Sequence, residues 1–121
     1  MSITSFQEHV EGWLRACFPA AVRSDRTERT HRFLEEALEL AQANDCSRED
    51  AIKLVHYVYD RPKGVPDLEA GGVMVTLAAL CSASSINMKV AGDNELKRNW
   101  DRIEVIRAKQ AAKPHGSPLP Q

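Results

Sequence analysis

The chain lacks the short motifs that mark the commonest nucleotide-binding loops and zinc sites. It has no GxxxxGK[ST] and no GxGxxG sequence, which excludes a P-loop and a dinucleotide-binding turn. Its four histidines form no HExxH or HxxxH pair, and its three cysteines form no CxxC pair. We therefore expect neither a zinc site nor a disulfide framework, and the odd number of cysteines favours a reducing, cytoplasmic compartment.

Long apolar runs and an excess of one charge are also missing. The longest run without a charged residue, residues 70–88, is interrupted by Ser, Thr, Gly and Asn. Its strongly apolar part, residues 73–81, is too short for a membrane span, which needs about 20 residues. The first residues contain acids and no long apolar run, so no signal peptide is expected. The net charge of −1 shows no basic excess, and we expect neither a membrane nor a nucleic-acid polymer as a partner.

The apolar residues recur at helical spacing, and no segment shows the alternation of a strand. Ser5 and Glu8 match a capping box before the first helix, which Pro19 ends. A second helix is predicted over residues 27–43, and a third begins after a cap at Ser47. A fourth runs from Pro66 to about residue 84, and a fifth begins after residues 92–94. The pattern predicts an all-α fold, a four- to five-helix bundle in a single domain over residues 1–113. Residues 114–121 form a proline-rich tail. We expect it to pack along the bundle or to lie near the site, with Leu119 as an apolar anchor, and a disordered terminus is the alternative.

Three glutamates crowd one side of the second predicted helix. Glu35, Glu36 and Glu39 form an arc beside the apolar face, although like charges four residues apart repel each other. No Lys or Arg follows within four residues of Glu36 or Glu39, and carboxylates in the C-terminal half of a helix oppose its dipole. A solvated face is one interpretation. The other is a cation from outside the helix, and Mg²⁺ or Mn²⁺ prefers such hard oxygen ligands.

A further carboxylate is expected to come from the fourth predicted helix. Glu69 lies in its first turn, and the residues after it are apolar nearly all round, so this helix should be central. A carboxylate at the edge of a core needs a partner. Glu69 is therefore either a third metal ligand or a simple partner of the helix dipole.

The glutamate cluster resembles the motif of a known enzyme family. The sequence EEALE, residues 35–39, fits the EExxE motif of the MazG-like all-α nucleoside triphosphate pyrophosphohydrolases. The strings YVYDRPKG, EAGGVMVTLAALC and IRAKQAAKPHGSPLPQ are similar to a phage and bacterial branch of this group. The resemblance covers residue 27 to the C-terminus. It implies a helical bundle, usually a dimer or a dimer of dimers, that binds Mg²⁺ and splits nucleoside triphosphates into a monophosphate and pyrophosphate.

The resemblance also assigns roles to residues. Glu36 and Glu39 match the family's metal ligands, Glu35 matches the accompanying glutamate, and Glu69 matches the glutamate of a second motif, ExxD. The aspartate of that motif is replaced here by Gly72. In such a site Glu35 or Glu36 would orient or deprotonate the attacking water.

Substrate binding is expected from the fifth predicted helix. Its basic residues can hold phosphates, and its tryptophan can stack on a base. The candidates are Lys97, Arg98, Arg102 and Trp100. Each also has a simpler interpretation, either as a solvated charge or as a residue that packs in the bundle.

The sequence thus predicts a Mg²⁺- or Mn²⁺-dependent hydrolase of nucleoside triphosphates, working as a homodimer or a larger homo-oligomer. The substitution at Gly72 supports one alternative, a non-catalytic protein that binds a nucleotide or a protein through a degenerate site. A second alternative is a helical adaptor whose glutamate cluster is only surface.

Overall fold

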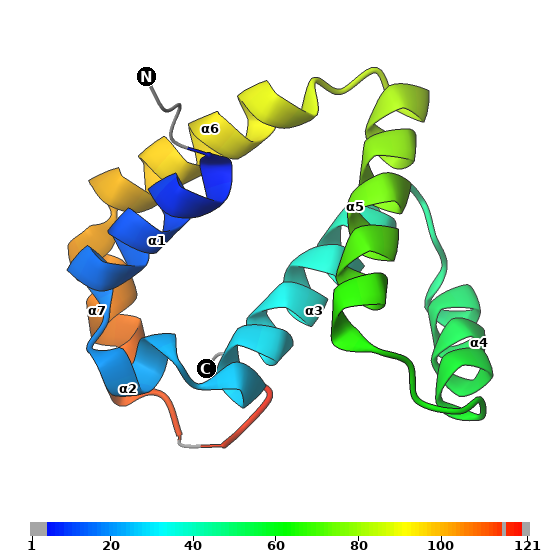
Figure 1. Cartoon of the computed structure of the whole chain (residues 1–121), viewed down its shortest axis with the longest axis horizontal. Coiled ribbons are helices and arrows are strands. Elements are labelled where there is room, and N and C mark those ends of the chain that lie inside the picture. The colour runs from blue at the N-terminus through cyan, green and yellow to red at the C-terminus, as the bar shows by residue number, and fades with distance from the viewer. Residues whose placement is uncertain (1–4, 115, 120–121) are drawn as a thin grey trace. The chain divides into compact units, whose positions relative to one another are not determined.

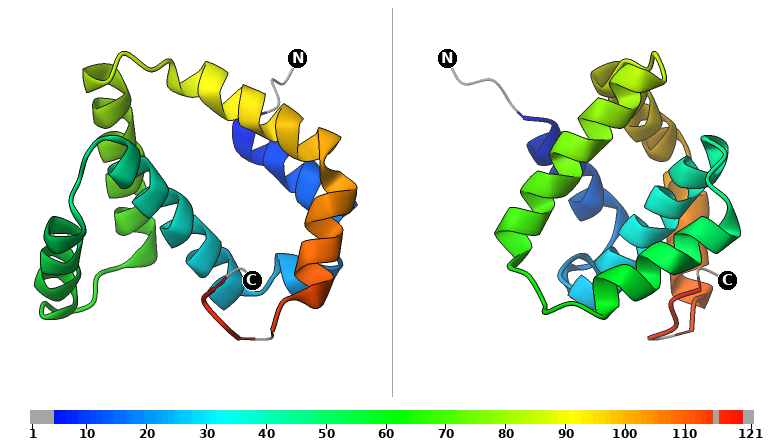
Figure 2. Two further views of the ribbon diagram at one scale, coloured as in Figure 1. Left: turned by 180° about the vertical axis from the view of Figure 1, so that it is seen from behind. Right: turned by 90° about the vertical axis from the view of Figure 1, so that its right-hand side faces the viewer.

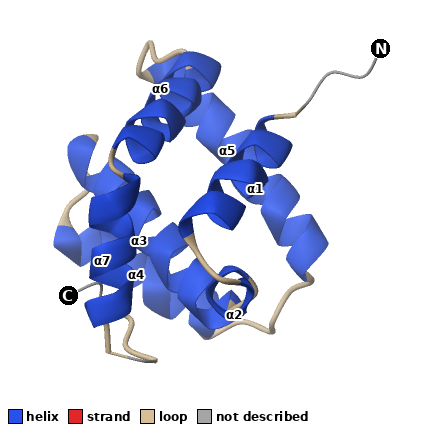
Figure 3. Ribbon diagram, turned by 90° about the vertical axis from the view of Figure 1, so that its left-hand side faces the viewer, coloured by secondary structure: helices blue, strands red, loops and turns tan. Residues whose placement is uncertain are grey.

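The computed structural model describes residues 5–114 and 116–119, which form seven helices and no strand (Figure 3). This confirms the all-α class. The helices are α1 (Phe6–Cys17), α2 (Ala20–Arg23), α3 (Arg26–Ala43), α4 (Arg48–Tyr59), α5 (Pro66–Ala83), α6 (Met88–Asp101) and α7 (Ile103–Ala112). Of the tail, His115 and residues 120–121 lie outside the described part.

Helix starts follow the capping signals of the sequence. The Ser5 side chain accepts the backbone N–H of Glu8, and the Glu8 carboxylate accepts the N–H of Ser5, which completes the expected capping box. Ser47 caps α4 by accepting the N–H of Asp50 at 3.1 Å. Pro66 occupies the first turn of α5, where its missing N–H costs nothing.

The structure differs from the expected helix boundaries at three places. Pro19 ends α1 as predicted, but it also precedes a further short helix, α2. The fifth predicted helix begins earlier than expected, at Met88, so residues 92–94 lie inside α6. It is then interrupted at Arg102, after which α7 begins.

The chain divides into two compact units, one from Met1–Glu36 with Val90–Gln121 and one from Ala37–Lys89. We call them the terminal unit and the central unit. The helix α3 belongs to both, because the division falls between Glu36 and Ala37. The assignment of residues 1–113 to one domain stays a prediction.

The terminal unit has a small aromatic core. Trp13, Cys17 and Phe18 are buried, and the two rings meet edge to face at 5.8 Å between centroids. Side chains from α1, α2, α6 and α7 pack around them, namely Leu14, Val22, Leu96, Ile103 and Ile106. Figures 1 and 2 show α1 lying along α6. Gly92 permits this contact, because a Cβ there would lie 3.1 Å from the Phe6 ring.

The central unit contains two helix ends of the same geometry. After α3, Asp45 has a φ of 66° and the N–H of Cys46 bonds to the carbonyl of Ala41. After α5, Ser85 has a φ of 57° and the N–H of Ile86 bonds to the carbonyl of Cys81. Both are Schellman motifs without the usual glycine. The Ser84 hydroxyl donates to the Asn44 amide oxygen at 2.9 Å, which joins the two ends.

The central unit buries almost none of its apolar side chains. Cys81 is its one buried residue. On α5, Leu68 is 73% exposed, Met74 69% and Val75 70%, although this helix is apolar on every side. Ile52, Leu54, Val55, Tyr57, Val58 and Tyr59 of α4 are exposed as well. A helix that is apolar all round is normally covered in the native assembly.

No single helix in the described ranges is long and apolar enough to cross a membrane. In the same ranges, only α5 and α6 taken together, with a bend between them, have the length and apolar composition of a membrane span.

The capping box at Ser5 gives a direct prediction for stability. Replacing Ser5 with alanine should lower the free energy of unfolding by about 1 kcal/mol, because the N–H of Glu8 loses its acceptor. Urea denaturation measures this change. Gln7→Ala, an exposed substitution in the same turn, is the matched control and should change stability little. Equal effects of the two substitutions would show that the cap contributes nothing.

Candidate functional site

The three crowded glutamates lie on α3 as predicted. Glu36 and Glu39 are exposed and three residues apart, so their carboxylates leave the same side of the helix. Glu35 is less exposed, because Arg32 donates to its carboxylate from Nη1 at 3.1 Å. The helix therefore presents two exposed carboxylates next to a third that an arginine holds in place.

Glu69 is exposed in the first turn of α5. Its carboxylate lies against the preceding loop, where Oε2 would clash with a Cβ at Gly64. Glu69 and Glu39 both belong to the central unit, whereas Glu36 belongs to the terminal unit. The role of Glu69 as a third ligand stays a prediction.

The described residues of this chain contain no group of three or more His, Cys, Asp or Glu placed to hold a metal ion. The carboxylate oxygens of Glu36 and Glu39 fit the chemistry of Mg²⁺, which prefers hard oxygen ligands and keeps several waters. A complete set of ligands for the predicted ion therefore needs a carboxylate or water beyond this pair.

The glycines after Glu69 have open surroundings. A Cβ built on Gly71 or on Gly72 would meet no atom within 4 Å. The carbonyl of Gly72 accepts the Thr76 hydroxyl at 2.9 Å, so the helix is intact at this point. Nothing in the described chain approaches closely enough to require glycine at either position.

The basic residues predicted to bind substrate have local acidic partners. On α6, Lys97 pairs with Asp101 at 3.1 Å and Arg98 pairs with Glu95 at 3.6 Å, and all four side chains are more than half exposed. Such exposed pairs contribute little to stability and can exchange partners readily. Arg102 lies at the break between α6 and α7, and Trp100 is 44% exposed. Their roles in substrate binding stay predictions.

A second basic group, which the sequence analysis missed, surrounds the start of α3. Glu28 is buried there, and it is paired with Arg29, Arg32 and Lys113. Burial lowers the pKa of Arg29, whose guanidinium lies 5.3 Å from the centre of the Phe18 ring. Of these three cations, Arg32 also reaches the glutamate motif, since it pairs with Glu35 one turn later on α3. Arg29 and Arg32 lie one and four residues after Glu28, so the sequence could have indicated these two pairs. The pair with Lys113 could not be inferred from the sequence, because Lys113 lies 85 residues from Glu28.

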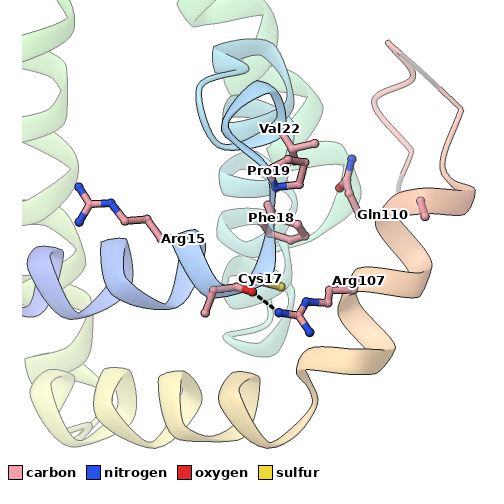
Figure 4. A pocket seen from close by; sticks show the side chains of 9 residues that line it. Arg15, Cys17, Phe18, Pro19, Val22, Arg107 and Gln110 are labelled. Carbon is pink, nitrogen blue, oxygen red and sulfur yellow. Dashed lines mark hydrogen bonds between the residues drawn. The ribbon is translucent and has the colours of Figure 1, made fainter.

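A pocket of about 560 Å³ lies in the terminal unit between α1, α2 and α7 (Figure 4). Its walls include Phe18, Pro19 and Val22, and Arg107 donates across one side to the carbonyl of Ala16. Arg107 also pairs with Glu104 at 2.8 Å, and burial raises the pKa of the Cys17 thiol. None of the site residues predicted from the sequence lines this pocket.

In comparisons with known proteins, the chain matches no family model, no curated protein and no solved structure.

Proposed function

We propose that this protein is a Mg²⁺-dependent nucleotide pyrophosphohydrolase, which converts a nucleoside or deoxynucleoside triphosphate and water into the monophosphate and pyrophosphate. The observation that carries the proposal is the arrangement on α3, where Glu36 and Glu39 are exposed at a spacing of three and Glu35 is held by Arg32. The resemblance of residues 35–39 to the EExxE motif supports the same conclusion. The three free cysteines support a reducing, cytoplasmic location.

The roles of the residues follow from their chemistry. Glu36 and Glu39 would hold Mg²⁺ or Mn²⁺ with Glu69 as the candidate third ligand, and the ion would neutralise charge on the phosphate oxygens. The water oxygen bonds to the α-phosphorus while its proton passes to Glu35 or Glu36. The bond from the α-phosphorus to the bridging oxygen breaks, and pyrophosphate leaves. Lys97, Arg98 and Arg102 are the candidates to hold its phosphates.

The direct test is pyrophosphate release from a panel of ribo- and deoxyribonucleoside triphosphates with Mg²⁺ or Mn²⁺. We expect equal amounts of monophosphate and pyrophosphate from at least one nucleotide, and no release after chelation of the metal. Nucleotide binding without turnover would favour the non-catalytic alternative. Absence of both metal and nucleotide binding would favour the helical adaptor.

We also propose that the protein is a homodimer, in which the helices α4 and α5 of two copies form a bundle of the all-α pyrophosphohydrolase type. The exposed apolar side chains of the central unit support this. They cover α5 on all sides, far beyond the scattered apolar residues of an ordinary monomer surface. A second copy presents the same apolar surface, as a two-fold interface requires. The open sides of Gly71 and Gly72 leave room for another backbone.

Gly72 separates the catalytic proposal from the degenerate one. Gly72→Asp should tighten Mg²⁺ binding roughly tenfold, since it adds a carboxylate three residues after Glu69 and a Cβ there meets no atom within 4 Å. Isothermal titration with Mg²⁺ measures the change. Gly71→Asp is the matched control, because it has the same open space but points 100° away around the helix. Equal affinities of the two variants would show that residue 72 does not face the ion.

A further inference from the structure

The buried carboxylate of Glu28 ties the end of the chain to the start of α3. Lys113, the residue that ends α7, donates from Nζ to Oε1 of Glu28, and the two side chains are only 5% and 10% exposed. Arg29 and Arg32 approach Oε2 of the same carboxylate at 3.6 and 3.5 Å. Removing the ammonium of Lys113 should be costly, because Oε1 of Glu28 would stay buried without its hydrogen-bond donor.

The tail makes a second contact with α3. Arg32 donates from Nη2 to the backbone carbonyl of Pro118. Figure 1 shows the C-terminal segment running from α7 back to the start of α3. Pro114 and Pro118 restrict the segment, so that it loses little conformational entropy when it docks. We call Lys113, Pro114 and residues 116–119 the C-terminal strap.

These contacts correct one expectation and support another. The tail does contact α3 through the Pro118 carbonyl, which agrees with an ordered tail. However, Leu119 is 72% exposed, so the apolar side chain expected to anchor the tail does not do so. The contacts that the structure records between the strap and α3 are polar, one from Lys113 and one through the Pro118 carbonyl.

Arg32 connects the strap to the glutamate motif. Its guanidinium faces Glu28 through Nε, the Pro118 carbonyl through Nη2 and the Glu35 carboxylate through Nη1. The planar fork of an arginine can hold all three in one geometry, whereas a lysine could not. All of these residues belong to the terminal unit.

We propose that the C-terminal strap fixes Arg32, and that Arg32 is a positioning residue for the carboxylate of Glu35. The inference rests on the proposed function, in which Glu35 lies beside the reacting water. The Pro118 carbonyl, 86 residues away in the chain, immobilises Arg32, and Arg32 in turn orients the Glu35 carboxylate at the start of the EExxE motif.

Deletion of residues 114–121 tests the proposal, because it removes the Pro118 carbonyl and keeps the pair of Lys113 with Glu28. We expect kcat to fall about tenfold and the KM for nucleotide to stay within about twofold, since orientation rather than binding is lost. In an Arg32→Gln background the same deletion should lower kcat no further. Equal losses of kcat in both backgrounds would overturn the proposal.

A measurement that needs no activity keeps this inference separate from the proposed function. The NMR signal of the Arg32 Nε–H group should be sharp in the full chain and broadened in the truncated one. The Nε–H signal of Arg29 should be unchanged, because the Phe18 ring, and not the strap, holds the Arg29 guanidinium. An Arg32 signal unaffected by the deletion would refute the strap. If the full chain hydrolyses no nucleotide, the proposed function fails, and this signal alone decides whether the strap fixes Arg32.

Lys113→Met distinguishes positioning from simple stabilisation. It leaves Glu28 buried without its ammonium partner and should lower the melting temperature, whereas Lys109→Met, at an exposed site on α7, should not. If truncation lowers only the melting temperature and spares both kcat and the Arg32 signal, the strap has a structural role and the proposal is wrong.

Discussion

Replacing Glu39 with glutamine is expected to abolish metal-dependent nucleotide hydrolysis, with a loss in kcat/KM of at least ~100-fold. Glutamine keeps the shape of the side chain and removes the charge that would hold the ion. The fold should not suffer, because Glu39 is exposed and like charges on this helix repel each other. Glu36→Gln and Glu69→Gln should behave in the same way if these residues complete the site.

Pyrophosphate release and the melting temperature must be measured on the same samples. Glu49→Gln is the matched control, since it removes an equal charge from an exposed position on α4 outside the predicted site. Retention of most activity in Glu39→Gln would exclude this residue as a ligand. A loss of activity accompanied by unfolding would mean that the carboxylate has a structural role instead.

The helices themselves could be predicted from the sequence because their signals are local. Ser5, Ser47 and Pro66 each mark a helix start within one turn, and each start is found there. The ends of α3 and α5 were harder to predict from the sequence. Asp45 and Ser85 adopt the left-handed conformation that glycine usually takes at a helix end. The sequence therefore has no glycine to mark either end. The break at Arg102 carries no proline or glycine at all.

The candidate site divides in the same way between local and distant contacts. Glu36 and Glu39 share a side of α3 because residues three apart are neighbours in any α-helix. The position of Arg32 is different, since it depends on Pro118 and on Glu28 with its partner Lys113. Helical periodicity does not encode a contact across 86 residues, so this part of the site required the structure.

The exposed apolar helices of the central unit lead to the second large prediction. Val75→Glu should convert the proposed homodimer into a monomer at micromolar concentration, raising the dissociation constant by at least ~100-fold. On a monomer surface the same change would be harmless, because Val75 is 70% exposed in the single chain and glutamate is a good helix former. The size of the effect therefore depends on whether a second copy covers α5.

Sedimentation velocity and circular dichroism at several concentrations test this prediction. Gln42→Glu is the control, since it makes the same change in net charge at an exposed polar position of the central unit. Dissociation should also cost helicity and make the melting temperature of the wild type rise with concentration, because residues 37–89 bury only Cys81 within one chain. A wild type that sediments as a monomer with full helicity would show that the central unit is stable without a second copy, and the homodimer would have to be abandoned.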